Sequence, residues 1–343
     1  MKKLLSLLLA LTLCLGSALA LTSCKKDKTP DVKVDANKEK YVIGICQLVT
    51  HDALDSATQG FKDALTAALA AEGREVEFKY QNAAGDSNAC VTIVNSFVAD
   101  DVDLILANAT AALQAAANAT LDIPVLGTSI TEYGVALEID DFDGTVGGNV
   151  SGTSDLAPLE TQAQMMIDTL GLTAGKTVGL LYCSAEANSQ YQVNVVKNYL
   201  TGKGIVATEY KFNDSNDLQS ITQSAADNCD AIYVPTDNTA ASNTEIINNV
   251  CSGKKVPVFA GEEATCKGCG YATLSISYYN IGKKTGEMAA EILLGKKNIS
   301  KMAIAYDTAP VKKYNEAACK NLGIDVEALK TKGYVVIPGT EAE

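Results

Sequence analysis

Short apolar runs alternate with longer amphipathic stretches along most of the chain. Residues 41–46 and 102–107 are runs of strand length, and each leads through a polar loop into a segment with apolar residues at three- to four-residue spacing. Continuous apolar runs are typical of strands buried on both faces, and the wider spacing is typical of amphipathic helices. The alternation therefore predicts an α/β fold built on parallel sheets with right-handed crossovers.

The same order of elements occurs twice. Residues 103–112 and 230–241 each run from strand through a small-residue polar loop into a helix, and each is followed by a strand that opens with Pro-Val, at Pro124 and Pro257. Such loops at the ends of parallel strands form ligand-binding edges. Two of them predict two similar lobes that face each other, with a small molecule held between them.

Residues 129–154 interrupt this alternation. They are rich in Gly, Asp and Thr and show no clear helical pattern, so we expect the chain to cross between lobes there. The segments near the C-terminus are expected to cross back. We predict an N-terminal lobe of residues 41–153 plus about 278–306, and a C-terminal lobe of residues 154–277 plus about 307–338.

The chain starts like an exported protein. Two lysines precede an apolar stretch over residues 4–20, which is typical of a secretory signal peptide (residues 1–23). The following Leu-Thr-Ser-Cys, ending at Cys24, resembles a bacterial lipobox, which implies a lipid anchor on Cys24. An ordinary signal peptide or an uncleaved anchor are the alternatives. Residues 24–40 are strongly charged and are expected to form a flexible tether.

Charge and composition narrow the functional classes. The formal net charge is −13, which argues against nucleic acid as a partner. Arg74 is the only arginine and His51 the only histidine, so an arginine clamp on an anion and most acid–base catalysis are disfavoured. No nucleophile elbow, phosphate-binding loop or zinc-protease motif occurs. We therefore expect a binding protein without a cofactor, and not an enzyme.

The cysteines do not indicate a metal site. Cys46 and Cys183 fall in predicted core strands, where a cysteine usually acts as a small apolar residue. Cys266 and Cys269 form a single C-x-x-C spacing in a predicted loop, without a second pair or a nearby histidine. A local disulfide or two free thiols is favoured there over a metal or redox site.

Several motifs resemble one known family. The chain is similar to the tryptophan/tyrosine-type substrate-binding proteins of ABC transporters from about residue 41 to residue 295. The motifs that carry the resemblance, in order, are IGICQLVTHDALD at 43–55, QGF at 59–61, YQNAAGD at 80–86, EANS at 186–189, YVPTDNT at 233–239 and FAGE at 259–262. Cys46 and the Cys266/Cys269 pair are departures from the pattern.

The resemblance implies the type I periplasmic-binding fold: two Rossmann-like lobes joined by three crossovers around a hinged cleft. It also implies capture of an amino acid, often aromatic, and delivery to an ABC permease in the cytoplasmic membrane. A nucleoside, a sugar or another amino acid in the same fold, or a role as a ligand sensor for a membrane receptor, are the alternatives. The low aromatic content, without tryptophan, disfavours a sugar.

An amino acid ligand needs donors for its carboxylate and acceptors for its ammonium group. Helix N-termini, helped by Thr110 (an expected N-cap) and by Ser129 or Ser189, would hold the carboxylate. Asp237 and Glu262 follow strand ends and are the expected counter-charges for the ammonium group, although each has a structural alternative, as a helix cap and as a solvated loop acid. The other expected ligand-binding residues are Gln47, His51, Asn188, Thr236 and Asn238.

Overall fold

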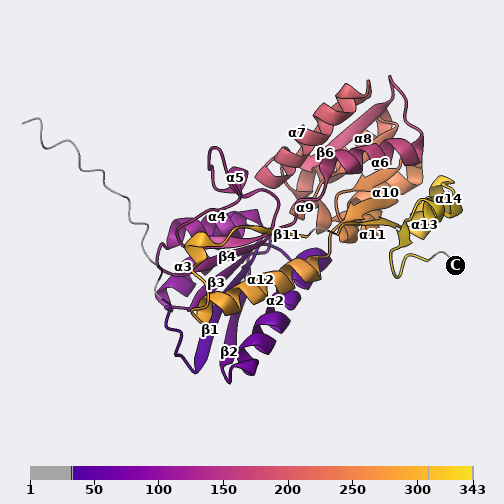
Figure 1. Cartoon of the computed structure of the whole chain (residues 1–343). Helices are drawn as coiled ribbons and strands as arrows, with labels where there is room; N and C mark the ends of the chain where they lie inside the picture. The colour runs from indigo at the N-terminus through magenta and orange to yellow at the C-terminus, as the bar shows by residue number, and fades with distance from the viewer. Residues whose placement is uncertain (1–31, 33, 308, 342–343) are drawn as a thin grey trace, which may run out of the picture.

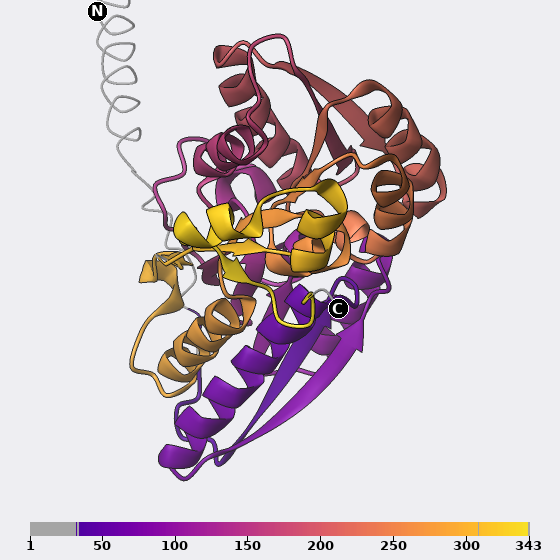
Figure 2. The ribbon, with the colours of Figure 1, turned by 90° about the vertical axis from the view of Figure 1, so that its right-hand side faces the viewer.

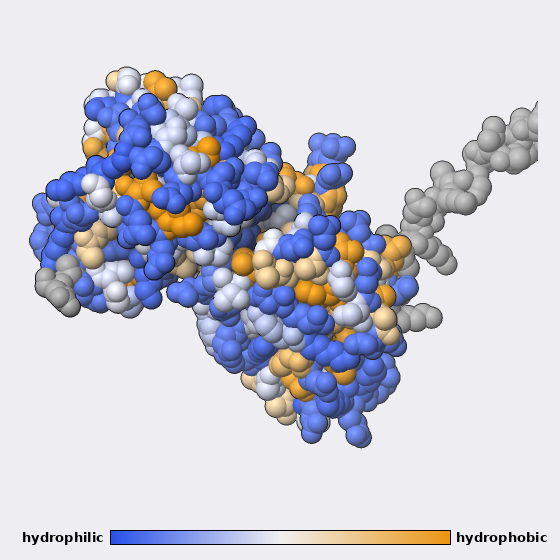
Figure 3. Space-filling model, turned by 180° about the vertical axis from the view of Figure 1, so that it is seen from behind, coloured by the Kyte–Doolittle hydropathy of each residue, from blue (hydrophilic) through white to orange (hydrophobic). Residues whose placement is uncertain are grey.

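The structure is a computed structural model that describes residues 32, 34–307 and 309–341. It contains two α/β lobes, each with its own sheet covered by helices (Figure 1). Seen from behind, the lobes meet at a narrow waist and are mainly hydrophilic on the surface (Figure 3). None of the helices in the described part of the chain is long and apolar enough to cross a membrane. The predicted signal peptide and Cys24 lie outside the described residues.

The first sheet has the strand order β11-β5-β4-β3-β1-β2, and all its strands are parallel. Its strands are β1 (Lys40–Gln47), β2 (Glu75–Asn82), β3 (Leu104–Asn108), β4 (Val125–Ile130), β5 (Val150–Ser154) and β11 (Ala305–Tyr306). The helices that flank it are α2 (Asp52–Ala71), α3 (Ser87–Ala99), α4 (Thr110–Ala119), α5 (Tyr133–Ala136) and α12 (Tyr278–Leu293).

The second sheet has the order β13-β12-β10-β9-β8-β6-β7, in which β12 runs antiparallel to β10. Its strands are β6 (Thr177–Cys183), β7 (Val206–Phe212), β8 (Ala231–Val234), β9 (Val258–Ala260), β10 (Ala272–Ser275), β12 (Val311–Tyr314) and β13 (Val335–Val336). Its helices are α6 (Leu159–Leu170), α7 (Ala187–Gly202), α8 (Ser215–Asn228), α9 (Asn238–Ala241), α10 (Thr244–Lys254), α11 (Glu263–Cys269), α13 (Glu316–Leu322) and α14 (Val326–Thr331).

The two sheets share one arrangement. The first four strands of each lobe lie in the same spatial order, β2-β1-β3-β4 in one and β7-β6-β8-β9 in the other. This confirms the two-lobed α/β fold expected from the repeated sequence pattern. Within the described residues the chain passes between the sheets after β5, after β10 and between β11 and β12.

Helix α12 belongs to the first lobe because it packs closely along α2 (Figure 2). A Cβ atom at Gly282 would lie 1.9 Å from the Ala57 carbonyl oxygen, and one at Gly60 would lie 2.2 Å from the Tyr279 carbonyl oxygen. Only glycine allows backbones to approach this closely. The helix that follows the second crossover is therefore held rigidly against the helix that begins beside the cleft.

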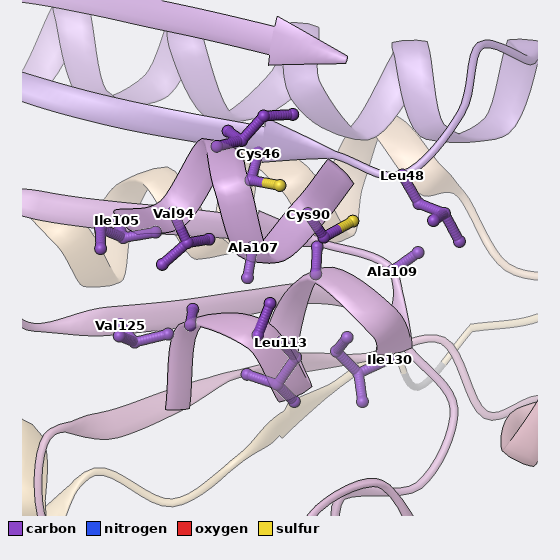
Figure 4. Packing of buried hydrophobic residues seen from close by; sticks show 14 of the residues in the cluster. Cys46, Leu48, Cys90, Val94, Ile105, Ala107, Ala109, Leu113, Val125 and Ile130 are labelled. Carbon is purple, nitrogen blue, oxygen red and sulfur yellow. The ribbon is translucent and has the colours of Figure 1, made fainter. Parts of the chain in front are cut away.

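The core of the first lobe lies on both faces of its sheet. Figure 4 shows one side, where Cys46 on β1 and Cys90 on α3 pack among aliphatic residues such as Val94 and Leu113. Both thiols are fully buried, and the interaction with the Cys90 thiol, followed by burial, raises the pKa of Cys46. Cys46 thus acts as a small apolar residue, as does Cys183, which is also buried.

Three details of the sequence interpretation were wrong. Residues 129–154 contain a short helix, α5, and the buried strand β5, so the chain leaves the first lobe only after residue 154. The helix expected at the end of the 230–241 segment is divided into α9 and α10. The pair Cys266 and Cys269 lies on helix α11 and not in a loop, and both thiols are free and buried. Small and polar residues conceal strand and helix patterns in these segments.

Candidate functional site

The carboxyl ends of the parallel strands in the two lobes face each other across a cleft. One inter-lobe cavity of about 270 Å³ lies between the β1–α2 and β2–α3 loops on one side and the starts of α7, α8 and α9 on the other. A second, of about 340 Å³, lies near the second crossover, between α2 and α11. The lobes also touch directly, since His51 Nε2 lies 3.3 Å from Asn238 Oδ1.

Unpaired polar atoms gather on the first lobe's side of this cleft. Seven buried side-chain atoms have no hydrogen-bond partner among the described residues, and four of them belong to the first lobe: His51 Nδ1, Asn108 Oδ1, Ser129 Oγ and Asp155 Oδ1. They lie after β1, at the end of β3, near the end of β4 and directly after β5. Buried polar groups are normally paired, so four exceptions along one sheet edge mark a place where a polar ligand fits.

Asp155 is the acid of this group. It is buried, and Tyr278 donates its hydroxyl to Oδ2 at 2.8 Å, which leaves Oδ1 unpaired. Burial raises the pKa of Asp155, and the hydrogen bond from Tyr278 opposes the rise. Asp155 follows the first crossover strand and Tyr278 begins α12, so the pair joins two of the segments that connect the lobes.

Donors lie on the neighbouring strands. Ser129 has φ +57°, a conformation unusual for a non-glycine residue, and this turns its backbone where β4 shifts register. Ala109, at φ +82°, is the N-cap of α4 and supplies no side-chain hydrogen bond to it. The expectation that Thr110 is the N-cap is therefore wrong, since Thr110 is the first residue of the helix. The uncapped start of α4 directs backbone N–H groups toward the cleft edge.

Gln47 lies at the end of β1 and is fully buried. It donates to the Val49 carbonyl at 2.9 Å and to Asp55 at 2.6 Å, and it accepts from Thr58 at 2.7 Å. Both the nitrogen and the oxygen of its amide group are therefore paired within the protein, which makes Gln47 a positioning residue. It fixes the loop that carries His51.

Glu186 organises the second lobe's side of the cleft. Its two carboxylate oxygens accept from the backbone N–H and the side chain of Asn238, and from the backbone N–H and hydroxyl of Thr239, at 2.7–3.0 Å. The carboxylate therefore holds the start of α9 against the start of α7. It also fixes the orientation of the Asn238 amide group.

Asp237 serves as a helix cap. Its carboxylate accepts from the Cys183 backbone N–H at 2.7 Å and from the Ala240 backbone N–H at 2.8 Å, and it is the N-cap of α9. Burial, and then the charge of Glu186, raise the pKa of Asp237 to about 8. Of the two roles considered from the sequence, the structure has the capping role.

Glu262 has the same role one strand further along. It is buried at the N-cap of α11 and accepts from the backbone N–H groups of Ala264 and Thr265. It is not a solvated loop acid. Both acids that the sequence suggested as counter-charges thus already bind backbone donors at helix starts.

The remaining expected site residues form one network in the second lobe. The Thr236 carbonyl oxygen accepts from Asn188 and Gln192, each at 3.0 Å, and from the Ser189 hydroxyl at 3.5 Å. Gln192 also accepts from the Thr236 backbone N–H at 3.0 Å. The network ties α7 to the loop after β8 and keeps that loop in one conformation.

Sequence reasoning did not single out Asn108, Asp155 or Glu186 as site residues. Asn108 directly follows the strand predicted over 102–107 and is the last residue of β3, and that position is the signal that could have identified it. Asp155 follows β5, which the sequence pattern did not reveal. Within the described residues there is no group of three or more His, Cys, Asp or Glu side chains arranged to hold a metal ion.

Comparison with known proteins places these features in a family. A family model described as "ABC transporter substrate binding protein" matches residues 42–331. A curated tyrosine-binding protein of Clostridioides difficile is 35% identical over 300 residues, which cover 86% of this chain and 85% of that protein.

Two solved structures are also similar. One is an ABC domain in complex with L-Trp from Streptococcus pneumoniae, with 30% identity, a TM-score of 0.79, and coverage of 86% of this chain and 100% of that one. The other is the ligand-free, open structure of a substrate-binding protein with adhesive properties from Clostridium difficile, with 34% identity, a TM-score of 0.64, and coverage of 86% and 99%.

Proposed function

This chain belongs to the substrate-binding proteins of ABC transporters, a family of binding proteins and not enzymes, and from that premise we propose that it captures an aromatic amino acid. Two relatives support this class of ligand, one by its name as a tyrosine-binding protein and one by its complex with L-Trp. The observation that carries the proposal is the set of four buried, unpaired polar atoms along the first lobe's edge of the cleft. The atoms of Asn108, Ser129 and Asp155 suit the main chain of a free amino acid, and His51 Nδ1 lies on the side of its side chain.

The ligand's carboxylate binds at the start of α4. The uncapped N-terminus of this ten-residue helix offers backbone N–H groups and the positive end of its dipole, beside the buried Thr110. The unpaired Ser129 hydroxyl on the adjacent strand adds a donor. No arginine is needed for this mode of binding, which agrees with a chain whose only arginine, Arg74, lies outside the cleft.

The ligand's ammonium group binds at Asp155. Its unpaired Oδ1 is a buried acceptor that carries a negative charge when the carboxyl is ionised, and Asn108 Oδ1 is a second unpaired acceptor two strands away. An ammonium group would compensate for the burial of the Asp155 carboxylate, because a buried charge is stabilised by an opposite charge that also donates hydrogen bonds.

The ligand's side chain then lies between the lobes. His51 reaches the second lobe at Asn238, and the network of Asn188, Ser189 and Thr236 supports the opposite wall. Asp237 and Glu262 contribute by holding that wall in place rather than by contacting the ammonium group. A ligand that contacts both lobes would bind the closed conformation better than the open one, and would shift the equilibrium toward the closed conformation.

Two parts of the proposal rest on the sequence. We propose that Cys24 carries a lipid anchor that holds the protein outside the cytoplasmic membrane, with residues 24–40 as the tether. An ABC permease in that membrane is the partner that receives the ligand, as the family implies. Replacement of Cys24 by Ala should release the protein from the membrane fraction without changing its affinity for the ligand.

The test is a calorimetric and thermal-shift screen of the purified protein against all amino acids, common sugars and nucleosides. A ligand that binds only the folded state raises the Tm by mass action. We expect a rise with Trp, Tyr or both. A response to sugars or nucleosides alone would overturn the assignment to amino acids while leaving the family intact.

A further inference from the structure

The hydrogen bonds around His51 fix which of its ring nitrogens carries the proton. Asn238 donates its Nδ2 to the Glu186 carboxylate at 2.7 Å, so Asn238 Oδ1 points away from Glu186 and toward His51. An amide oxygen only accepts, and therefore His51 Nε2, at 3.3 Å, is the donor. Since a neutral imidazole has a single N–H, Nδ1 is left as an acceptor.

That acceptor is buried and has no partner within the described residues. The residues on either side of His51 line two different inter-lobe cavities: Leu48 and Val49 line one, and Asp52 and Ala53 line the other. His51 itself lines neither cavity; it lies in sequence between these two stretches and contacts the second lobe at Asn238. A ligand group that meets Nδ1 there must supply a hydrogen-bond donor, because a group without one would leave the acceptor unpaired.

The strand order gives the distance from the main-chain anchors. The first lobe's sheet runs β5-β4-β3-β1 along this edge, and adjacent strands are about 4.8 Å apart. An amino acid whose α-carbon lies over β4 or β3 would place a ring over β1, roughly 5–10 Å along the edge. The indole N–H of Trp and the phenol O–H of Tyr extend that far from the α-carbon, and Phe has no donor at the same place.

We propose that His51, oriented through Asn238 by Glu186, is the specificity-determining residue that selects a ring bearing an N–H or O–H group over a plain phenyl ring. This inference rests on the proposed binding of aromatic amino acids and adds its selectivity. Glu186 and Asn238 are positioning residues that act through the tautomer of His51. A site built to bond a ligand hydroxyl strongly rejects the analogue that lacks it.

The simpler alternative is that His51 is only the N-cap residue of α2. However, its side chain makes no capping hydrogen bond to that helix, and its one hydrogen bond runs to the other lobe. The imidazole is thus not needed to complete the helix, and the hydrogen bond that it makes sets the state of Nδ1.

The affinity test compares Tyr with Phe, and Trp with 1-methyltryptophan, by calorimetry. The wild-type protein should bind each analogue without a donor at least roughly 30-fold more weakly than its parent. His51→Phe keeps an aromatic side chain at position 51 but removes the acceptor. The affinities for Tyr and Trp should therefore fall while the affinity for Phe does not. The affinities of the two members of each pair should come within about threefold of each other. Equal affinities in the wild-type protein, or an equal loss for all four ligands in His51→Phe, would overturn the proposal.

A second measurement needs no variant. His51 is the only histidine, so ¹⁵N-histidine labelling reports one imidazole in the NMR spectrum of the whole protein. We expect the Nε2–H tautomer in the free protein, and a shift of the Nδ1 resonance on addition of Tyr or Trp but not of Phe. An Nδ1–H tautomer would overturn the proposal. If Phe bound as tightly as Tyr, the role of His51 would be overturned and the proposed function would stand. If no aromatic amino acid gave a response, the role of His51 and the proposed function would both be overturned.

Discussion

The two sheet edges that face each other across the cleft have the same strand order but differ in what their acidic side chains bind. On the first lobe, atoms of Asn108, Ser129 and Asp155 are buried without partners. On the second lobe, the corresponding acids Asp237 and Glu262 bind backbone N–H groups at helix starts. We interpret the first lobe's edge as the one that binds the ligand, and the second lobe's edge as the one whose acids keep the loops in one conformation. Equivalent positions in a duplicated architecture therefore do not imply equivalent roles.

The largest expected effect comes from Asp155→Asn. Losing the charge that binds the ligand's ammonium group should weaken binding of Trp or Tyr by roughly 100-fold, as for a hydrogen bond between charged groups. Burial raises the pKa of Asp155 above its unfolded value, so its contribution to stability is full at low pH and is lost as the pH rises through the folded pKa. At pH 7 the ligand-free variant should therefore have a Tm no lower than that of the wild-type protein.

Calorimetry and a thermal melt of Asp155→Asn check both parts of that expectation. Asp237→Asn is the matched control, a second buried aspartate whose replacement should change ligand affinity by less than about threefold. Unchanged affinity in Asp155→Asn would place the ammonium group elsewhere and remove the contrast between the edges.

Glu262→Ala tests the rigid edge. It removes a buried cap that accepts two backbone N–H groups, and should lower the free energy of unfolding by about 1–2 kcal/mol. Ligand affinity should change little, because the carboxylate contacts the protein and not the ligand. Chemical denaturation and calorimetry separate the two quantities. A large loss of affinity with unchanged stability would instead make Glu262 the ligand's counter-charge, as the sequence suggested.

Two replacements of Ser129 test whether its hydroxyl contacts the ligand at the first lobe's edge. Ser129→Gly removes the hydroxyl but suits φ +57°, so it should weaken ligand binding roughly tenfold at unchanged Tm. Ser129→Ala should show the same loss of affinity and a Tm close to that of the wild-type protein, because it keeps the Cβ that Ser129 already has at this left-handed position. If the two variants kept wild-type affinity, the hydroxyl would not contact the ligand.

The last effect is a dependence of affinity on pH. A ligand ammonium group favours ionised Asp155, so binding lowers its raised pKa and releases a proton between the bound and free values. Affinity should fall as the pH falls through the pKa of the free protein, by at most about tenfold per pH unit. Calorimetry between pH 7 and 5 measures this, and Asp155→Asn should show a flat profile. A wild-type affinity that rises on acidification would contradict it.

The sequence predicts the framework of this molecule better than its site. Strands such as β8, with its continuous apolar run, were identified at their observed positions, because burial on both faces leaves a clear pattern. Strand β5 reads Val-Ser-Gly-Thr-Ser and conceals its burial among small polar residues. Because Asp155 follows this hidden strand, its position at the cleft edge could not be deduced.

The positions of Asp237 and Glu262 after strand ends were predicted, but not what their carboxylates bind. Whether an acid at the start of a helix caps that helix or faces a ligand depends on its rotamer and on competing donors, which sequence spacing does not specify. The packing of α12 on α2, in contrast, depends on glycines whose role becomes evident only when the two helices are seen in contact.

The bond between Tyr278 and Asp155 has a consequence for how the binding specificity of such a protein can evolve. The acid that we propose to bind the ligand's ammonium group is also hydrogen-bonded to Tyr278 at the start of α12, next to the second crossover between the lobes. Substitutions there would disturb motion and recognition together, and selection should resist them. Positions beside β1 do not combine ligand binding with a contact to the crossover in this way. After gene duplication, one copy could therefore acquire a new preference for the ligand's side chain there, while it keeps the crossover contact and the binding of the amino acid main chain.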